Sequence, residues 1–120
     1  MDKTGKIRAR KENFAIIKAK KFLPETFACI NDGKEITAII EQAKINEKYV
    51  IDIQRDYKLL SFDMTLPFDL VGFIAKISKA LAEEKIPIFV ISGYSTDHIL
   101  IHKKYIEKAK KKLKSLGFAT

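Results

Sequence analysis

The chain has 120 residues, of which 47% are hydrophobic and 10% aromatic, and this composition excludes a disordered tail and suits one globular core. No apolar run approaches the roughly 18 residues of a membrane-spanning helix, and no apolar segment follows the charged N-terminus, so we expect a cytoplasmic protein without a signal peptide or membrane segment. Cys29 is the only cysteine, which excludes an internal disulfide and any multi-cysteine zinc site.

The net charge of +8 is concentrated in two stretches, residues 3–11 and 103–114. In the second stretch the apolar residues recur at helical spacing, so most of its lysines fall on the solvated face of a helix. Only Arg8, Arg10 and Arg55 supply the guanidinium fork that reads phosphates and bases, among 23 basic residues. We therefore interpret the charge as a solvated surface and keep nucleic-acid binding as the minor alternative.

The first half of the chain is predicted to be rich in strands. Residues 1–12 are expected to form a basic flexible tail and residues 13–56 a β-rich half. Short apolar or alternating runs predict strands at 14–20, 26–31, 36–41 and 49–53, separated by turn signals. Residues 35–44 also fit a helix, and we prefer the strand.

The second half, residues 57–120, has a clearer order. Strict alternation predicts a strand over 57–66, which Pro67 ends, and helical spacing from Leu70 to Leu81 then predicts a helix with Asp69 as its N-cap. A strand at 87–92, a polar interruption, a strand at 98–102 and the basic helix ending at Gly117 follow. The order strand, helix, strand, strand, helix is the α+β, ferredoxin-like plan without its last strand: an antiparallel sheet with two helices on one face.

Three segments of this half match a known family in position as well as in residue type: FDLVGF at 68–73, LAEEKIPIF at 81–89 and ISGYSTDHIL at 91–100. Through them, residues 66–118 resemble the second half of tandem ACT-domain proteins of the CASTOR type. The resemblance implies an ACT fold for residues 57–120 and a partial ACT-like half for 13–56. A strand from within residues 14–54, or one from a second subunit, is expected to complete the C-terminal sheet.

The resemblance also implies a site, because ACT domains bind amino acids or other small effectors between the loop after the first strand and the edge of the second. The residue types suit this use. Amides near Gly72 can hold a carboxylate, Asp69 or Asp97 can accept from an amino group, and the hydroxyls supply adaptable polar contacts. The predicted ligand-binding residues are Phe68, Asp69, Val71, Gly72, Phe73, Ser92, Ser95, Thr96 and Asp97.

Each of the central residues also has a purely structural explanation. Asp69 could only cap the helix, Gly72 could only permit close packing of helix on sheet, and Asp97 could only close a turn. Asp97, His98 and a nearby serine are the residue types of a hydrolase triad, but adjacent strand residues point to opposite faces. His98 and His102 would lie about 13 Å apart in a strand, too far for one zinc ion.

We therefore expect no catalytic residues, no metal site and no cofactor. The leading hypothesis is a non-enzymatic, cytoplasmic, homodimeric regulatory protein that binds an amino acid. A dimerisation or interaction module that keeps the ACT fold but binds no ligand is the first alternative, and a basic nucleic-acid-binding domain is the second. The sequence does not identify the effector.

Overall fold

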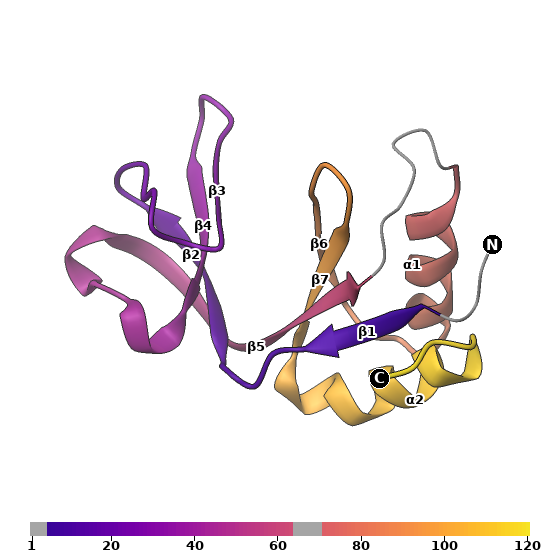
Figure 1. Ribbon diagram of the computed structural model, residues 1–120. Coiled ribbons are helices and arrows are strands. Elements are labelled where there is room, and N and C mark those ends of the chain that lie inside the picture. The colour runs from indigo at the N-terminus through magenta and orange to yellow at the C-terminus, as the bar shows by residue number, and fades with distance from the viewer. Residues whose placement is uncertain (1–4, 64–70) are drawn as a thin grey trace. The chain divides into compact units, whose positions relative to one another are not determined.

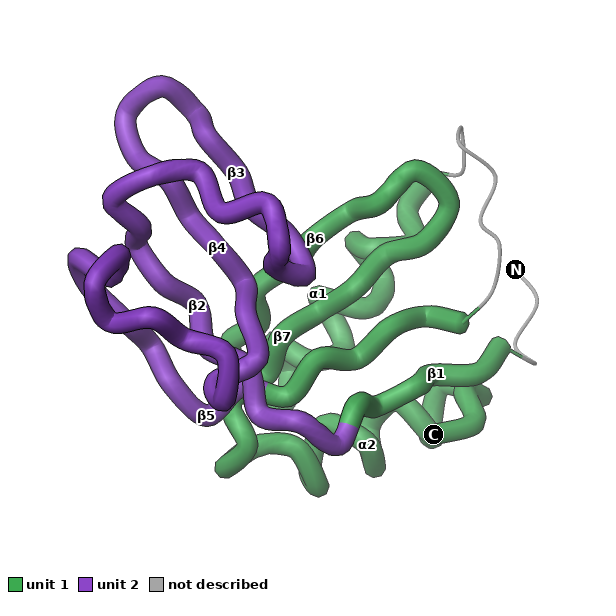
Figure 2. Tube along the Cα trace, turned by 60° about the vertical axis from the view of Figure 1, so that its left-hand side comes forward, with its two compact units in different colours: residues 1–10, 58–120 green, residues 11–57 purple. Residues whose placement is uncertain are grey.

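The computed structural model describes residues 5–63 and 71–120, and the chain forms two compact units (Figures 1 and 2). Unit 1 combines residues 1–10 with 58–120, and unit 2 consists of residues 11–57. The long strand β5 (Val50–Asp63) begins in unit 2 and ends in unit 1. The chain therefore enters unit 1, leaves it to form unit 2, and returns along β5.

Unit 1 is an antiparallel sheet in the order β1-β5-β7-β6, with helices in the connections. Ile7 of β1 lies opposite Phe62 of β5, and Phe89 of β6 lies opposite Leu100 of β7. This arrangement confirms the predicted α+β, ferredoxin-like fold. Besides β5, its elements are β1 (Lys6–Ala9), α1 (Phe73–Glu83), β6 (Phe89–Ser92), β7 (Asp97–His102), the 3₁₀ turn η3 (Lys103–Tyr105) and α2 (Ile106–Ser115).

The core of unit 1 lies between the sheet and both helices. Three phenyl rings form its centre: Phe62 packs edge-on against Phe73 at 5.1 Å and against Phe118 at 5.8 Å between ring centroids. Such edge-to-face contacts add about 0.5–1.5 kcal/mol to the burial of the rings. The other buried members are Ile7, Leu60, Ile77, Leu81, Ile86, Ile99, Ile101, Ala109 and Leu113.

The strand that completes the sheet of unit 1 is β1. This corrects two expectations, because Lys6–Ala9 is not part of a flexible tail and no strand from within residues 14–54 takes this position. Ile7 is 2% exposed, and its amide also donates to the carbonyl of Ala119 at 2.7 Å. The buried side chain of Ile7 holds β1 on the sheet. One apolar residue among charged neighbours is too short a pattern to predict a strand from the sequence.

Two other boundaries differ from the sequence prediction. The sequence predicts separate strands at 49–53 and 57–66, but residues 50–53 and 57–63 belong to one strand, β5, which continues through Asp56 at a φ of 68°. Tyr49 belongs to η2, and residues 64–66 of the second run lie outside the described residues. Helix α1 begins at Phe73 with Gly72 as its N-cap, whereas the predicted N-cap Asp69 lies outside the described residues.

Unit 2 has its strands in the order β3-β4-β2-β5. The ambiguous stretch at 35–44 is a strand through Glu41, as preferred, followed by a 3₁₀ turn. The elements of unit 2 are β2 (Phe14–Ala19), β3 (Ala28–Asn31), β4 (Ile36–Glu41), η1 (Gln42–Lys44), η2 (Glu47–Tyr49) and the first part of β5.

The two units share one strand order but differ in their connections. Numbered along the chain within each unit, with β1 counted as the last strand of unit 1, both sheets follow the order 4-1-3-2. In unit 2, residues 20–27 and 42–49 replace the two helices with loops and 3₁₀ turns. The core of unit 2 consists of small and aliphatic side chains on the sheet, namely Ala15, Ile17, Ala19, Ala38 and Ile40, with Leu23 packed against them.

Candidate functional site

The start of α1 and the β6–β7 turn, which hold the described residues of the two predicted site segments, lie at the same end of unit 1. Figure 1 shows the β6–β7 turn and the N-terminal end of α1 side by side at the end of the sheet where β5 stops. The hydrogen-bond contact between Ser61 of β5 and His98 of β7 marks the same end, since it joins the last residues of one strand to the first residues of the other.

The β6–β7 turn is closed by its backbone. The amide of Gly93 donates to the carbonyl of Thr96 at 2.9 Å, and Ser92 lies opposite Asp97 in the strand register. A Cβ atom on Gly93 would lie 3.0 Å from that carbonyl oxygen, which explains why glycine occupies the position. Ser92 and Ser95 are exposed, while Thr96 and Asp97 are half-buried, so the polar groups of this turn face solvent.

The residues before α1 divide into exposed and buried ones. Val71 is 92% exposed and Gly72 adopts a left-handed φ of 86°. Phe73 is 4% exposed and packs against Phe62 and Phe118 in the core. Its contact with a ligand stays a prediction. Phe68 and Asp69, also predicted to bind ligand, lie outside the described residues.

Helix α1 carries no side-chain cap at its first residue. The N-cap is a glycine, and the first intrahelical bond runs from the amide of Lys76 to the carbonyl of Gly72 at 3.0 Å. The amides of Phe73, Ile74 and Ala75 therefore have no acceptor within the helix, and together with the helix dipole they favour an anion.

A buried polar pair lies beside this end of the sheet. Ser61 is 1% exposed, and its Oγ lies 2.8 Å from Nδ1 of His98. Burial lowers the pKa of the His98 imidazole below its ordinary value, and the positive charge of Arg10 lowers the pKa further, while Asp97 opposes this. The sequence predicts the two strands but not their pairing, so this contact between residues 37 positions apart was missed.

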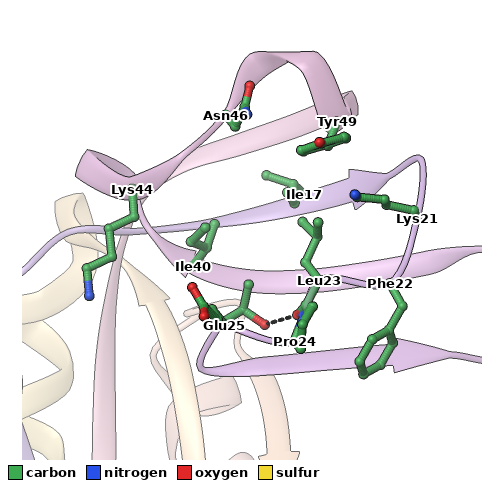
Figure 3. A pocket seen from close by; sticks show the side chains of 11 residues that line it. Ile17, Lys21, Phe22, Leu23, Pro24, Glu25, Ile40, Lys44, Asn46 and Tyr49 are labelled. Carbon is green, nitrogen blue, oxygen red and sulfur yellow. Dashed lines mark hydrogen bonds between the residues drawn. The ribbon is translucent and has the colours of Figure 1, made fainter.

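A pocket of about 470 Å³ opens in unit 2 (Figure 3). Sequence reasoning missed it because its walls come from three separate segments: β2, the β2–β3 connection, and β4 with the connection to β5. It is lined by Ile17, Lys21, Phe22, Leu23, Pro24, Glu25, Thr26, Ile40, Lys44, Asn46 and Tyr49.

Within residues 5–63 and 71–120, no three histidine, cysteine, aspartate or glutamate side chains gather in a way that could hold a metal ion. None of the helices in this part of the chain is long and apolar enough to cross a membrane.

Comparison with solved structures finds the same fold in proteins of low sequence identity. A protein from Agobacterium tumefaciens has a TM-score of 0.83 at 18% identity, with 97% of this chain and 91% of that chain covered. A protein of unknown function from Vibrio cholerae, described as a possible transport protein, has a TM-score of 0.77 at 20% identity, with 96% and 91% covered. The regulatory subunit of aspartate kinase from Thermus thermophilus has a TM-score of 0.69 at 12% identity, with 94% and 97% covered.

Sequence comparison identifies the family. No curated protein sequence matches the chain. The family model described as "ACT domain" matches residues 52–115, which is more than half of the 120 residues and includes both predicted site segments. The match spans α1, β6, β7 and α2, the elements that give unit 1 its ferredoxin-like sheet and two helices. The chain therefore belongs to the ACT domain family.

Proposed function

We propose that this chain is a non-enzymatic regulatory protein that binds an amino acid at residues 68–72 and 92–97. The observation that carries the proposal is that the start of α1, which has no side-chain cap, and the polar β6–β7 turn lie at the same end of an ACT-domain sheet. The likeness in fold to the regulatory subunit of an aspartate kinase supports a regulatory role. Similarity to the CASTOR type within the family remains a prediction.

The groups at this end match the two charged groups that all amino acids share. The effector carboxylate would accept hydrogen bonds from the first amides of α1, at the positive end of the helix dipole. The half-buried carboxylate of Asp97 would accept from the α-ammonium group. Ser92, Ser95 and Thr96 would then contact the effector side chain and select among amino acids.

A regulatory protein must also transmit the binding of its effector to a second molecule. In this proposal the protein is a cytoplasmic homodimer whose association, with itself or with a partner, changes when the effector binds. Such coupling requires that the effector bind one association state more tightly than the other. Light scattering of the purified protein with and without the effector would measure that difference directly.

A thermal-shift screen of the whole chain against the proteinogenic amino acids tests the binding step. A specific ligand should raise the melting temperature in a concentration-dependent way, because it binds the folded state only. Asp97→Asn should abolish the shift without a matching loss of unliganded stability. Asp52→Asn, which changes an exposed carboxylate in unit 2, serves as the control and should keep the shift.

Two results would count against the proposal. A shift that survives Asp97→Asn would move the effector away from the β6–β7 turn. The absence of a shift with every amino acid would favour an ACT-fold interaction module that binds no effector.

A further inference from the structure

The pocket of unit 2 is independent of the site proposed above, since all its lining residues lie between Ile17 and Tyr49. Its floor is the sheet, where Ile17 of β2 is 2% exposed and Ile40 of β4 is 7% exposed. Leu23, Pro24 and Tyr49 supply apolar walls. Its volume of about 470 Å³ falls within the range of small-molecule sites, roughly 300–1,000 Å³.

The pocket has a structural origin in the short connections of unit 2. In unit 1 the corresponding connections contain α1 and α2, which cover the sheet with Ile77, Leu81, Ala109 and Leu113. In unit 2 the same two connections are loops and 3₁₀ turns, which place Leu23 and Ile45 on the aliphatic residues of the sheet but supply no helix to cover it. An apolar cavity is therefore left where a helix would otherwise pack.

The wall formed by the β2–β3 connection is held in place by hydrogen bonds. Thr26 Oγ1 donates to the carbonyl of Leu23 at 2.9 Å, and the Leu23 amide donates to Sγ of Cys29 at 3.4 Å. These contacts fix both polar groups of the Leu23 backbone and direct its side chain to the floor residues (Figure 3). The cavity is thus preformed, which reduces the entropy cost of binding.

The charged groups at the pocket differ in whether they are already paired. Lys44 pairs with Glu41 at 2.8 Å. The ammonium group of Lys21 lies 4.2 Å from the centroid of the Tyr49 ring, and among the described residues it has no carboxylate partner. Figure 3 shows Lys21 and Glu25 on opposite sides of the apolar centre. Lys21 is therefore the cation available to a ligand, at the edge of an apolar cavity.

We propose that this pocket binds an apolar carboxylate, a molecule with a hydrocarbon body and one acidic group. The body would lie against Leu23, Pro24 and Tyr49, above the buried floor of the pocket. The carboxylate would accept from the ammonium group of Lys21 beside Tyr49. Burial of the hydrocarbon supplies most of the affinity, at about 25 cal/mol per Å² of apolar surface. The charge-assisted hydrogen bond to Lys21 selects the acid over a neutral analogue.

Octanoate and its neutral analogue 1-octanol are the probes, titrated into the ¹⁵N-labelled whole chain and followed by amide chemical shifts. Octanoate should shift the amides of the pocket residues. Lys21→Gln should weaken octanoate about two- to fivefold, the effect of losing one exposed ionic contact, and should leave 1-octanol unchanged. Lys20→Gln removes the neighbouring exposed lysine, which does not line the pocket, and should bind octanoate like the unchanged protein.

The proposal is overturned if octanoate shifts no amide of the pocket, or if Lys21→Gln and Lys20→Gln bind octanoate equally. It is also overturned if Lys21→Gln weakens 1-octanol as much as octanoate, since the lysine would then act through the shape of the pocket. The spectrum of each variant without ligand verifies that unit 2 is folded. Shifts confined to residues 92–97 would concern the amino-acid site and not this pocket.

Discussion

The contact between Ser61 and His98 places a polar pair on the sheet face of unit 1 that the helices do not cover. Leu60 and Phe62, on either side of Ser61, point into the helix-covered core, so Ser61 points to the opposite face. A buried hydroxyl without a partner would cost about 1–3 kcal/mol, and the imidazole provides that partner. Nδ1 of His98 either accepts from the Ser61 hydroxyl or donates to its oxygen, depending on which ring nitrogen carries the proton.

We predict that the native protein is less stable at pH 5 than at pH 7 because of His98. Burial and, secondarily, the charge of Arg10 lower the pKa of His98 from 6.5 in the folded state. A histidine with a depressed folded pKa contributes stability that is complete above the unfolded value and is lost as pH falls through the folded value. Urea unfolding at the two pH values should show this loss, and His98→Gln should reduce it.

A titration of the His98 ring by NMR gives the direct test. The midpoint should lie below 6.5 in the unchanged protein and should rise in Arg10→Gln, where a nearby positive charge is lost. Lys76→Gln removes an exposed positive charge from α1, on the other side of the sheet, and should leave the midpoint unchanged. A midpoint at or above 6.5 in the unchanged protein would contradict the assignment.

At the scale of elements, both helices of unit 1 end in the same hydrogen-bond pattern with different residues. After α1, Ile86 N–H donates to Leu81 O and Lys85 N–H donates to Ala82 O. After α2, Phe118 and Gly117 donate in the same way to Leu113 and Lys114. This is the Schellman motif, in which the first residue after the C-cap adopts a left-handed conformation. That residue is Lys85 after α1, with a φ of 58°, and Gly117 after α2, with a φ of 100°.

The matched termini predict opposite effects of substitution. Lys85→Gly should raise the free energy of unfolding by about 0.5–1 kcal/mol, because glycine adopts positive φ without the strain that lysine bears. Gly117→Ala should lower it by about 1 kcal/mol for the same reason. Urea denaturation of both variants measures the two changes. A loss of stability in Lys85→Gly would mean that the lysine side chain contributes more than its backbone strain costs.

The sequence predicts the elements of unit 1 better than it predicts how their side chains pack. Apolar alternation from Leu60 onward and helical spacing through Ile77 and Leu81 predict β5 and α1. Burial on one face explains the spacing of α1, whereas residues 59–62 of β5 are buried on both faces. The apolar character of Phe73 is evident from the sequence, whereas its packing against Phe62 in the core is visible only in the structure. The pocket of unit 2 was not predicted because it depends on the lack of a helix over the sheet, and a missing helix has no sequence pattern of its own.

At the scale of the whole molecule, the chain forms the same strand order twice, and the sequence of unit 2 is inserted between the two segments of unit 1. β1 precedes all of unit 2 in sequence yet pairs with the last residues of β5 in unit 1, over Lys6–Ala9 and Leu60–Asp63. This pairing closes an edge of β5 that would otherwise expose unpaired amides and carbonyls. Contacts between residues so far apart in sequence form slowly, because a long loop must close first. They are also difficult to predict, because no local sequence pattern indicates them.

Removal of the Ile7 side chain should therefore destabilise unit 1 although Ile7 lies near the N-terminus. Ile7 is 2% exposed in the core with Phe62 and Phe118, and truncation of a buried isoleucine to alanine costs about 2–5 kcal/mol. Lys6→Ala, on the exposed face of the same strand, is the control and should change stability by less than about 0.5 kcal/mol. Urea unfolding measures both free energies, and hydrogen exchange at residues 60–63 should accelerate in Ile7→Ala as β1 detaches. Equal stabilities of the two variants would show that β1 adds nothing to the sheet, and the closed edge of β5 would then need another explanation.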